Sequence, residues 1–200
     1  MPAGPSELFV IADESASPSA VAADLLSQAE HDRTAQVLLA TTSEDLARKI
    51  EAEVERQVAL LPRADIAREA LSHARAIIVS SLDQAVAVAN AYAPEHLTLA
   101  VADPDALTST VSNAGAVFAG HEAAESFGDY LAGSSHVLPT DGAARAWSGI
   151  SVYSFMKSIS IQKLTREASA RVAPATALLA RLEGLEAHAR AAEARMEMQV

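Results

Sequence analysis

Short apolar runs alternate with helix-forming segments along the first 120 residues, and no other feature constrains the fold as strongly. These runs have the length and apolar character of buried strands: ELFVIAD, AQVLLAT, AIIVSS, HLTLAV and AVFAG. Helical patterns separate them, and the first begins with a candidate N-cap, Ser17, followed by Pro18. Strands that alternate with helices pair in parallel. The sequence therefore predicts an α/β fold, with an open, mostly parallel sheet flanked by helices and followed by a helical C-terminal tail.

Residues 119–149 break this alternation. They are rich in Gly, Ser and Ala and lack periodicity, and long irregular loops inside compact domains are usually functional. In open α/β sheets, ligands bind at loops beyond the carboxyl ends of the strands. We therefore expect the functional site at that edge of the sheet.

A domain boundary is predicted near residue 150. The α/β domain, residues 1–150, carries most of the candidate site residues. Residues 151–200 predict short strands and then the helical tail, which is interrupted near Pro174 and Gly184. A helical tail after a loop-rich segment is typical of a contact with another domain or subunit.

Composition limits the possible chemistry. The 200-residue chain has no cysteine, so any metal must be held by His, Asp, Glu or amide oxygen. The formal net charge of −11 repels nucleic acid and anionic lipid, and it suits a cationic substrate or simple solubility. Neither a signal peptide nor an apolar run of about 18 residues occurs. We expect a cytoplasmic protein with no nucleic-acid and no membrane partner.

The stretch DLLSQAEHD places a glutamine and a histidine on an apolar-sided helix. Gln28 and His31 are three residues apart and point within about 60° of each other on an α-helix. An amide oxygen and an imidazole nitrogen on one rigid element are donor types that zinc accepts. A surface Gln–His pair explains the same spacing equally well.

Two further motifs carry groups suited to proton transfer or ligand binding. In YAPEHLTL, Glu95 and His96 stand at the mouth of a predicted strand, where each could serve a different step; the alternative is a solvent-facing Glu beside a packed His. Asp129 and His136 lie in the irregular loop, where Gly128 lets the backbone approach a ligand, although turns also favour Asp and Ser.

The remaining histidines give weaker signals. Glu183 and His188 lie five residues apart in the tail, which is not one face of an unbroken helix, so their local pattern indicates a solvated helix side. His73 and His121 have no clear partner in the sequence, and we predict no site at either.

Six segments occur in an order and at separations that resemble one known family: GPSE, DLLSQAEHD, PEHL, GDYLAGSSHVLPT, SGISVYSFMK and LEAHARA. Together they resemble histidinol dehydrogenase, the zinc enzyme that ends histidine biosynthesis. The resemblance covers essentially this whole chain but only the second half of the family's longer chain, so we expect a fragment, a split gene product or a shortened form. The other half holds the family's nucleotide-binding domain, and no G-x-G-x-x-G occurs here. The resemblance thus implies an NAD site outside this chain.

The resemblance also implies roles for individual residues. It implies four zinc ligands, of which the last comes from the partner subunit of a homodimer: Gln28, His31, Asp129 and His188. It implies a proton-transfer pair, Glu95 and His96. It implies substrate contacts at Ser6, Gln28, His31, His96, Asp129, His136, Glu183 and His188.

The activity implied by the resemblance is the NAD-dependent, two-step oxidation of L-histidinol through L-histidinal to L-histidine. Zinc would hold the amino and imidazole nitrogens of the substrate as a positioning template. His96 would take the alcohol proton and assist the second oxidation, and Glu95 would activate the water that adds to the aldehyde. Two other interpretations stay open: a zinc-dependent hydrolase with Glu95 as base, and a non-catalytic module that binds histidinol or histidine.

Overall fold

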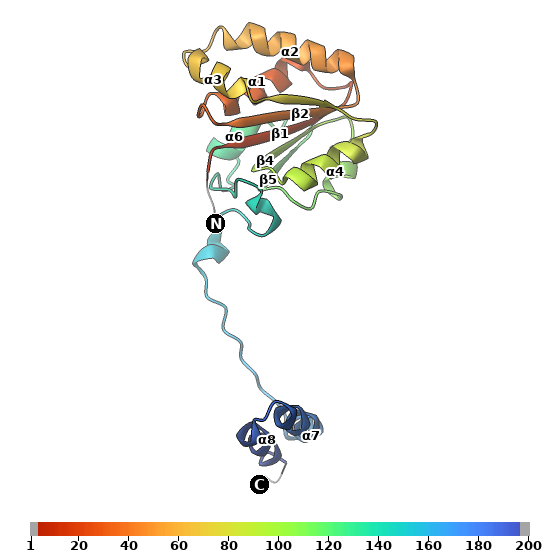
Figure 1. Cartoon of the computed structure of the whole chain (residues 1–200), viewed down its shortest axis with the longest axis vertical. Coiled ribbons are helices and arrows are strands. Elements are labelled where there is room, and N and C mark those ends of the chain that lie inside the picture. The colour runs from red at the N-terminus through yellow and green to blue at the C-terminus, as the bar shows by residue number, and fades with distance from the viewer. Residues whose placement is uncertain (1–3, 197–200) are drawn as a thin grey trace. The chain divides into compact units, whose positions relative to one another are not determined.

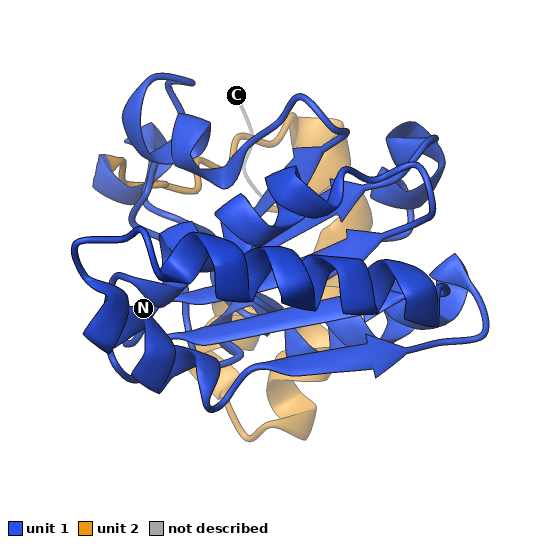
Figure 2. Ribbon diagram, turned by 90° about the horizontal axis from the view of Figure 1, so that it is seen from above, with its two compact units in different colours: residues 1–155 blue, residues 156–200 orange. Residues whose placement is uncertain are grey.

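The structure is a computed structural model that describes residues 4–196. The chain divides into two compact units, residues 1–155 and residues 156–200 (Figure 2). The first unit holds the sheet, and the second holds a pair of helices. None of the helices in the described part is long and apolar enough to cross a membrane.

The elements of the first unit follow one another as β1 (Glu7–Ala12), α1 (Pro18–Ala29), β2 (Gln36–Thr41), α2 (Glu44–Val58), α3 (Ala64–Leu71), β3 (Arg75–Ile78), α4 (Leu82–Tyr92), β4 (His96–Ala100), α5 (Pro104–Thr108), β5 (Ala116–Ala119), α6 (Glu125–Tyr130) and two 3-10 helices, η1 (Ala143–Arg145) and η2 (Val152–Phe155). The second unit contains α7 (Arg166–Leu182) and α8 (Glu186–Glu193).

All strands are parallel and form one five-stranded sheet in the order β3-β2-β1-β4-β5. This arrangement confirms the predicted open α/β fold. The first three helices cover one face of the sheet and α4 covers the other (Figure 1). The central strand β1 is buried on both faces, because Leu8 and Val10 pack toward α1 and α2 while Phe9 and Ile11 pack toward α4. This two-sided burial explains why its sequence is a continuous apolar run.

Local side-chain caps fix where several helices begin. The Ser17 hydroxyl accepts a hydrogen bond from the Ala20 amide, and Pro18 occupies the first turn of α1, as the sequence predicts. Ser43 and Ser81 cap α2 and α4 in the same way. Helix α3 is an additional helix that the sequence pattern did not predict.

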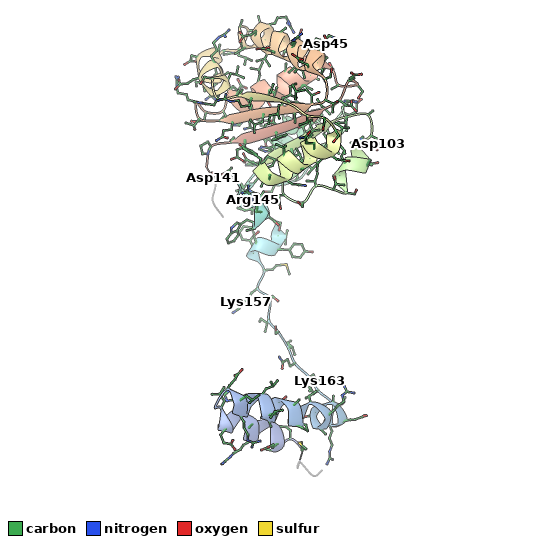
Figure 3. All side chains as sticks on the ribbon, turned by 45° about the vertical axis from the view of Figure 1, so that its right-hand side comes forward. Asp45, Asp103, Asp141, Arg145, Lys157 and Lys163 are labelled. Carbon is green, nitrogen blue, oxygen red and sulfur yellow. The ribbon has the colours of Figure 1, made fainter. Side chains whose placement is uncertain are left out.

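Three predictions of local structure are wrong. Asp129 lies in the short helix α6 rather than in an irregular loop. Residues 156–165 form no strand, because their apolar side chains have no strand to pair with; Ile161 is 88% exposed, and Lys157 and Lys163 project from the same segment (Figure 3). The tail helix α7 also continues through Pro174, since alanines on either side of it are buried against α8.

Candidate active site

The candidate residues of the first unit gather at the amino-terminal edge of the sheet. His96 is the first residue of β4, and its register partner Leu8 lies near the start of β1. Helix α1 follows β1 and runs back toward that edge, so Gln28, one residue before the end of α1, returns to it. The expected location at the carboxyl ends of the strands is therefore wrong. A residue near the carboxyl end of a βα unit's helix lies at the edge where the strand began.

Two buried glutamates, Glu7 and Glu95, exchange hydrogen bonds at this edge. Because Leu8 pairs with His96, Glu7 at the start of β1 lies beside Glu95, the residue just before β4. The Glu7 amide donates to a carboxylate oxygen of Glu95 at 3.0 Å, and the Glu95 amide donates to the Glu7 carboxylate at 3.2 Å. The Asp141 amide also donates to the Glu7 carboxylate, at 2.8 Å. The predicted alternative of a solvent-facing Glu95 is wrong, since this side chain is buried.

The pKa of Glu95 is raised to about 7, chiefly by burial. The negative charges of Glu7, Asp129 and Glu125 contribute to this rise, and the hydrogen bond from the Glu7 amide opposes it. Desolvation likewise raises the pKa of Glu7. A carboxyl group whose pKa lies near neutrality is suited to accept a proton at neutral pH and release it again.

The ring of His96 has a defined tautomer. Its Nδ1 lies 3.0 Å from the backbone carbonyl of Glu7, and a carbonyl only accepts, so Nδ1 carries the proton. Burial lowers the pKa of His96, which favours the neutral ring. In the neutral ring Nε2 is then the free base, and it has no hydrogen-bond partner among the described residues. This geometry presents a basic nitrogen to the interior of the site.

Glu125 is a site residue that the sequence analysis missed. It is 1% exposed; one carboxylate oxygen accepts from the Ser27 hydroxyl at 2.9 Å, and the other lies 3.7 Å from Nε2 of His96. Desolvation raises its pKa. One signal could have found it: Glu125 precedes Asp129 by four residues, and a predicted helix there would have placed both on one face.

Three buried atoms at this edge lack a hydrogen-bond partner in the described part of the chain: Oε1 of Gln28, Nε2 of His96 and Oε1 of Glu125. All three accept hydrogen bonds when the glutamate is ionised. Ligand atoms of His96, Glu125 and Asp129 also lie within 4.8 Å of one another, close enough to surround one cation. Buried acceptors without donors are costly. These donor types, amide oxygen, carboxylate oxygen and imidazole nitrogen, are ones that zinc accepts, and there are enough of them to serve a cationic ligand beside the metal as well.

The other predicted residues are placed less closely together. His31 is exposed in the turn that follows α1, where its amide donates to the Gln28 carbonyl at 3.2 Å. Its charge contributes to lowering the pKa of His96, so its side chain lies near the site, and its role as a partner of Gln28 stays a prediction. Ser6 is half-buried just before β1, and His136 is exposed. Two residues belong to the second unit, which is described by itself: Glu183 caps the end of α7, and His188 lies in α8.

The loop before β5 holds the Glu95–His96 segment in place. The Gly115 and Ala116 amides donate to the carbonyls of Pro94 and Glu95, both at 2.9 Å. A Cβ added at Gly115 would lie 2.5 Å from the Glu95 carbonyl oxygen, so only glycine lets these two backbones approach so closely.

Comparisons with known proteins identify the family of this chain. The sequence model described as "Histidinol dehydrogenase" matches residues 1–196. The chain belongs to this family. It is 52% identical over 196 residues to the histidinol dehydrogenase of Xanthomonas euvesicatoria pv. vesicatoria (strain 85-10), and 47% identical to that of Haemophilus influenzae (strain 86-028NP). Both alignments cover 98% of this chain and 46% of the relative.

A crystal structure of histidinol dehydrogenase from Elizabethkingia anophelis is also similar. Its TM-score is 0.95 at 46% sequence identity, and the match covers 98% of this chain and 46% of that one. The chain thus spans about half the length of the relatives that it matches. The histidinol dehydrogenases are a family of oxidoreductases, and the resemblance read from the motifs is confirmed.

The buried glutamates of this family member predict a pH-dependent stability. Glu7, Glu95 and Glu125 have pKa values raised above the reference value of 4.5, so the folded chain binds more protons than the unfolded chain as pH rises toward 7. The protonated glutamates therefore stabilise the folded chain fully below pH 4.5, and this stabilisation is lost as the pH rises from 4.5 through 7. The lowered pKa of His96 acts in the opposite direction below its reference value of 6.5 and offsets part of the loss.

We expect the metal-free chain, kept in a chelator, to be less stable at about pH 7.5 than at about pH 5, by about 2 to 4 kcal/mol. Urea unfolding at the two pH values measures this difference. Glu125→Gln should reduce the difference in unfolding free energy between the two pH values, whereas Glu51→Gln on the exposed surface of α2 should leave this difference unchanged. Equal stability at both pH values would mean that these carboxyl groups keep their ordinary pKa values.

Proposed function

We propose that this chain is the zinc- and substrate-binding part of a histidinol dehydrogenase, which oxidises L-histidinol through L-histidinal to L-histidine with NAD. The single observation that carries the proposal is the group of partnerless acceptors on Gln28, His96 and Glu125, buried beside Asp129. Histidinol is an amino alcohol with an imidazole ring, and its N–H and O–H groups supply the donors that these atoms lack.

Zinc would be held by Gln28, His31 and Asp129, with His188 from a second copy of the chain as the fourth ligand. The bound metal would position the substrate's nitrogens and polarise the reacting group. Gln28 supports this assignment because its amide oxygen is buried and free to coordinate. His31 is exposed beyond α1, a position from which its side chain is free to turn toward the metal.

The proton transfers are assigned to the two residues at the start of β4. His96 takes the hydroxyl proton of histidinol on Nε2 as the hydride leaves for NAD, because the Glu7 carbonyl keeps Nδ1 protonated. Glu95 takes a proton from the water that adds to the aldehyde, a step that a pKa of about 7 suits. Glu125 accepts a hydrogen bond from a substrate N–H, since its partnerless oxygen faces the same space.

The second unit supports the proposed homodimer. Leucines along α7 and after it are largely exposed: Leu178, Leu179, Leu182 and Leu185. His188 lines a hollow of about 1040 Å³ beside α7 and α8. Such an apolar surface is typical of a contact with another subunit. Glu183 would then contact the substrate from the same subunit as His188.

The NAD site is assigned outside this chain, because no described segment carries a dinucleotide-binding glycine motif. The chain alone should bind zinc and, with zinc present, histidinol, but NAD only very weakly. Calorimetric titration of the metal-free and zinc-loaded chain measures the affinities for zinc, histidinol and NAD. Glu125→Gln should keep zinc and weaken histidinol binding by about tenfold or more, whereas Glu51→Gln should change neither.

Micromolar affinity for NAD would show that the nucleotide site was misplaced. Histidinol binding that is unaffected by zinc removal would contradict the shared metal and substrate site. Hydrolysis of an amide or ester by the zinc-loaded chain, without NAD, would favour the zinc hydrolase instead.

A further inference from the structure

A second cavity lies at the opposite edge of the same sheet. It has a volume of about 240 Å³, and its wall includes Asp24, Thr98 and Ala100, while Ser15, Ser17 and His121 surround its mouth. It lies next to β1 and β4, the neighbouring strands between which the chain order of the sheet reverses. Open α/β sheets bind ligands at the carboxyl ends of strands at this kind of reversal. The proposed catalytic residues do not line it.

Two polar groups in the wall have no partner. The Thr98 hydroxyl is buried without a hydrogen bond, in a side chain that is 2% exposed. The Asp24 carboxylate makes no hydrogen bond or ion pair with any described residue, and burial is the only cause of its shifted pKa. Burial raises the pKa of Asp24 to about 6, which leaves the group largely ionised at neutral pH. A half-buried carboxylate and a buried hydroxyl without partners indicate a missing hydrogen-bond donor.

The surroundings of the cavity favour a positive charge. Its described lining contains no lysine or arginine. Asp13 adds a second carboxylate near the mouth, where amides and the Ser15 hydroxyl hold it and lower its pKa despite partial burial. His121 is bound to the Ser15 hydroxyl through Nε2, at 3.0 Å.

We propose that this cavity binds a small organic molecule through its primary ammonium group, which donates hydrogen bonds to Asp24 and Thr98. The hydroxyl group of Ser17 at the mouth, which accepts only from the Ala20 amide, donates a hydrogen bond to a polar group on the rest of the ligand. None of the proposed zinc ligands or catalytic residues lines the cavity, although it is close to them: Thr98 lies two residues along β4 from His96, a rise of about 6.6 Å, and Asp24 lies one turn before Gln28 on α1.

An ammonium ion fits better than the alternatives. A bare Ca²⁺ or Mg²⁺ requires about six oxygen ligands in a tight shell, whereas the wall offers one carboxylate and a cavity much larger than an ion. An anion would be repelled by the Asp24 carboxylate, and the described lining has no lysine or arginine to pair with it. An ammonium group needs only a few acceptors, and the cavity leaves room for the carbon chain attached to it.

The test uses the chain as it exists, in chelator, with ethanolamine as the probe and ethylene glycol as a neutral probe of the same size. We expect ethanolamine to bind saturably in the millimolar range and to shift the amide NMR signals of Ala100 and Gly120. Ethylene glycol and acetate should bind at least tenfold more weakly. Asp24→Asn should weaken ethanolamine binding at least tenfold, and the matched surface variant Asp83→Asn should not.

Thr98→Val should also weaken binding, by several-fold, without loss of stability, because it removes a hydroxyl that has no partner in the folded chain. His96→Asn, at the other edge of the sheet, should leave ethanolamine binding unchanged. The proposal is overturned if ethanolamine does not bind, if the glycol or acetate binds as tightly, or if His96→Asn rather than Asp24→Asn abolishes binding. Because zinc and histidinol are absent, none of these results depends on the function proposed above.

Discussion

Zinc binding should return to about a quarter of the unmutated level when two zinc-deficient variants, Asp129→Ala and His188→Ala, are unfolded and refolded together in equal amounts. Each variant alone should lose tight zinc binding, because each removes one proposed ligand. About half of the dimers in the mixture should contain one copy of each variant. In these mixed dimers one site combines an intact Asp129 with an intact His188, and the other site lacks both.

Metal content after dialysis measures the recovery, and mass spectrometry confirms that the subunits have mixed. The matched control is a mixture of Asp129→Ala with Asp83→Asn, an exposed carboxylate on α4. There only the Asp129→Ala copies lack a ligand, so zinc should remain near half of the unmutated level. If subunits mix and no zinc returns in the test mixture, the fourth ligand does not come from a second copy, and the proposed role of the tail fails.

Replacing His96 should have the largest effect on catalysis. The test requires a full-length enzyme, made by joining this chain to the half of the Xanthomonas relative that it does not match. His96→Asn removes the basic Nε2 that faces the site, so we expect both oxidation steps to slow by about 10² to 10⁴. Glu95→Gln should slow oxidation of histidinal by a similar factor and leave oxidation of histidinol to the aldehyde largely intact.

Single-turnover reduction of NAD with each substrate separates the two steps. Zinc content shows whether the site remains assembled, and Glu51→Gln serves as a surface control. Equal losses of both steps in Glu95→Gln would contradict the division of labour between the two residues. That result would fit a structural role instead, in which the hydrogen bond from the Glu7 amide to Glu95 holds β1 against β4.

The sequence alone determined the fold class and the family. Alternation of buried strands and helices is a local pattern, because the burial of each strand depends on its own run of apolar residues. Ser17 predicts the start of a helix for the same reason, since a capping side chain accepts a hydrogen bond from an amide only a few residues away. The adjacent pair Glu95 and His96 needed no tertiary information to be found.

Only the tertiary structure decided where the site lies and which side chains complete it. Glu7 and Glu95 are 88 residues apart, and the register of β1 against β4 brings their backbones into mutual hydrogen bonds. Glu125 and Ser27 meet across 98 residues, and the same packing leaves the Glu125 carboxylate buried and facing His96. Burial and contacts between distant segments set the pKa values and the tautomer at this edge. These are properties of the packed chain, and no local pattern of residues encodes them.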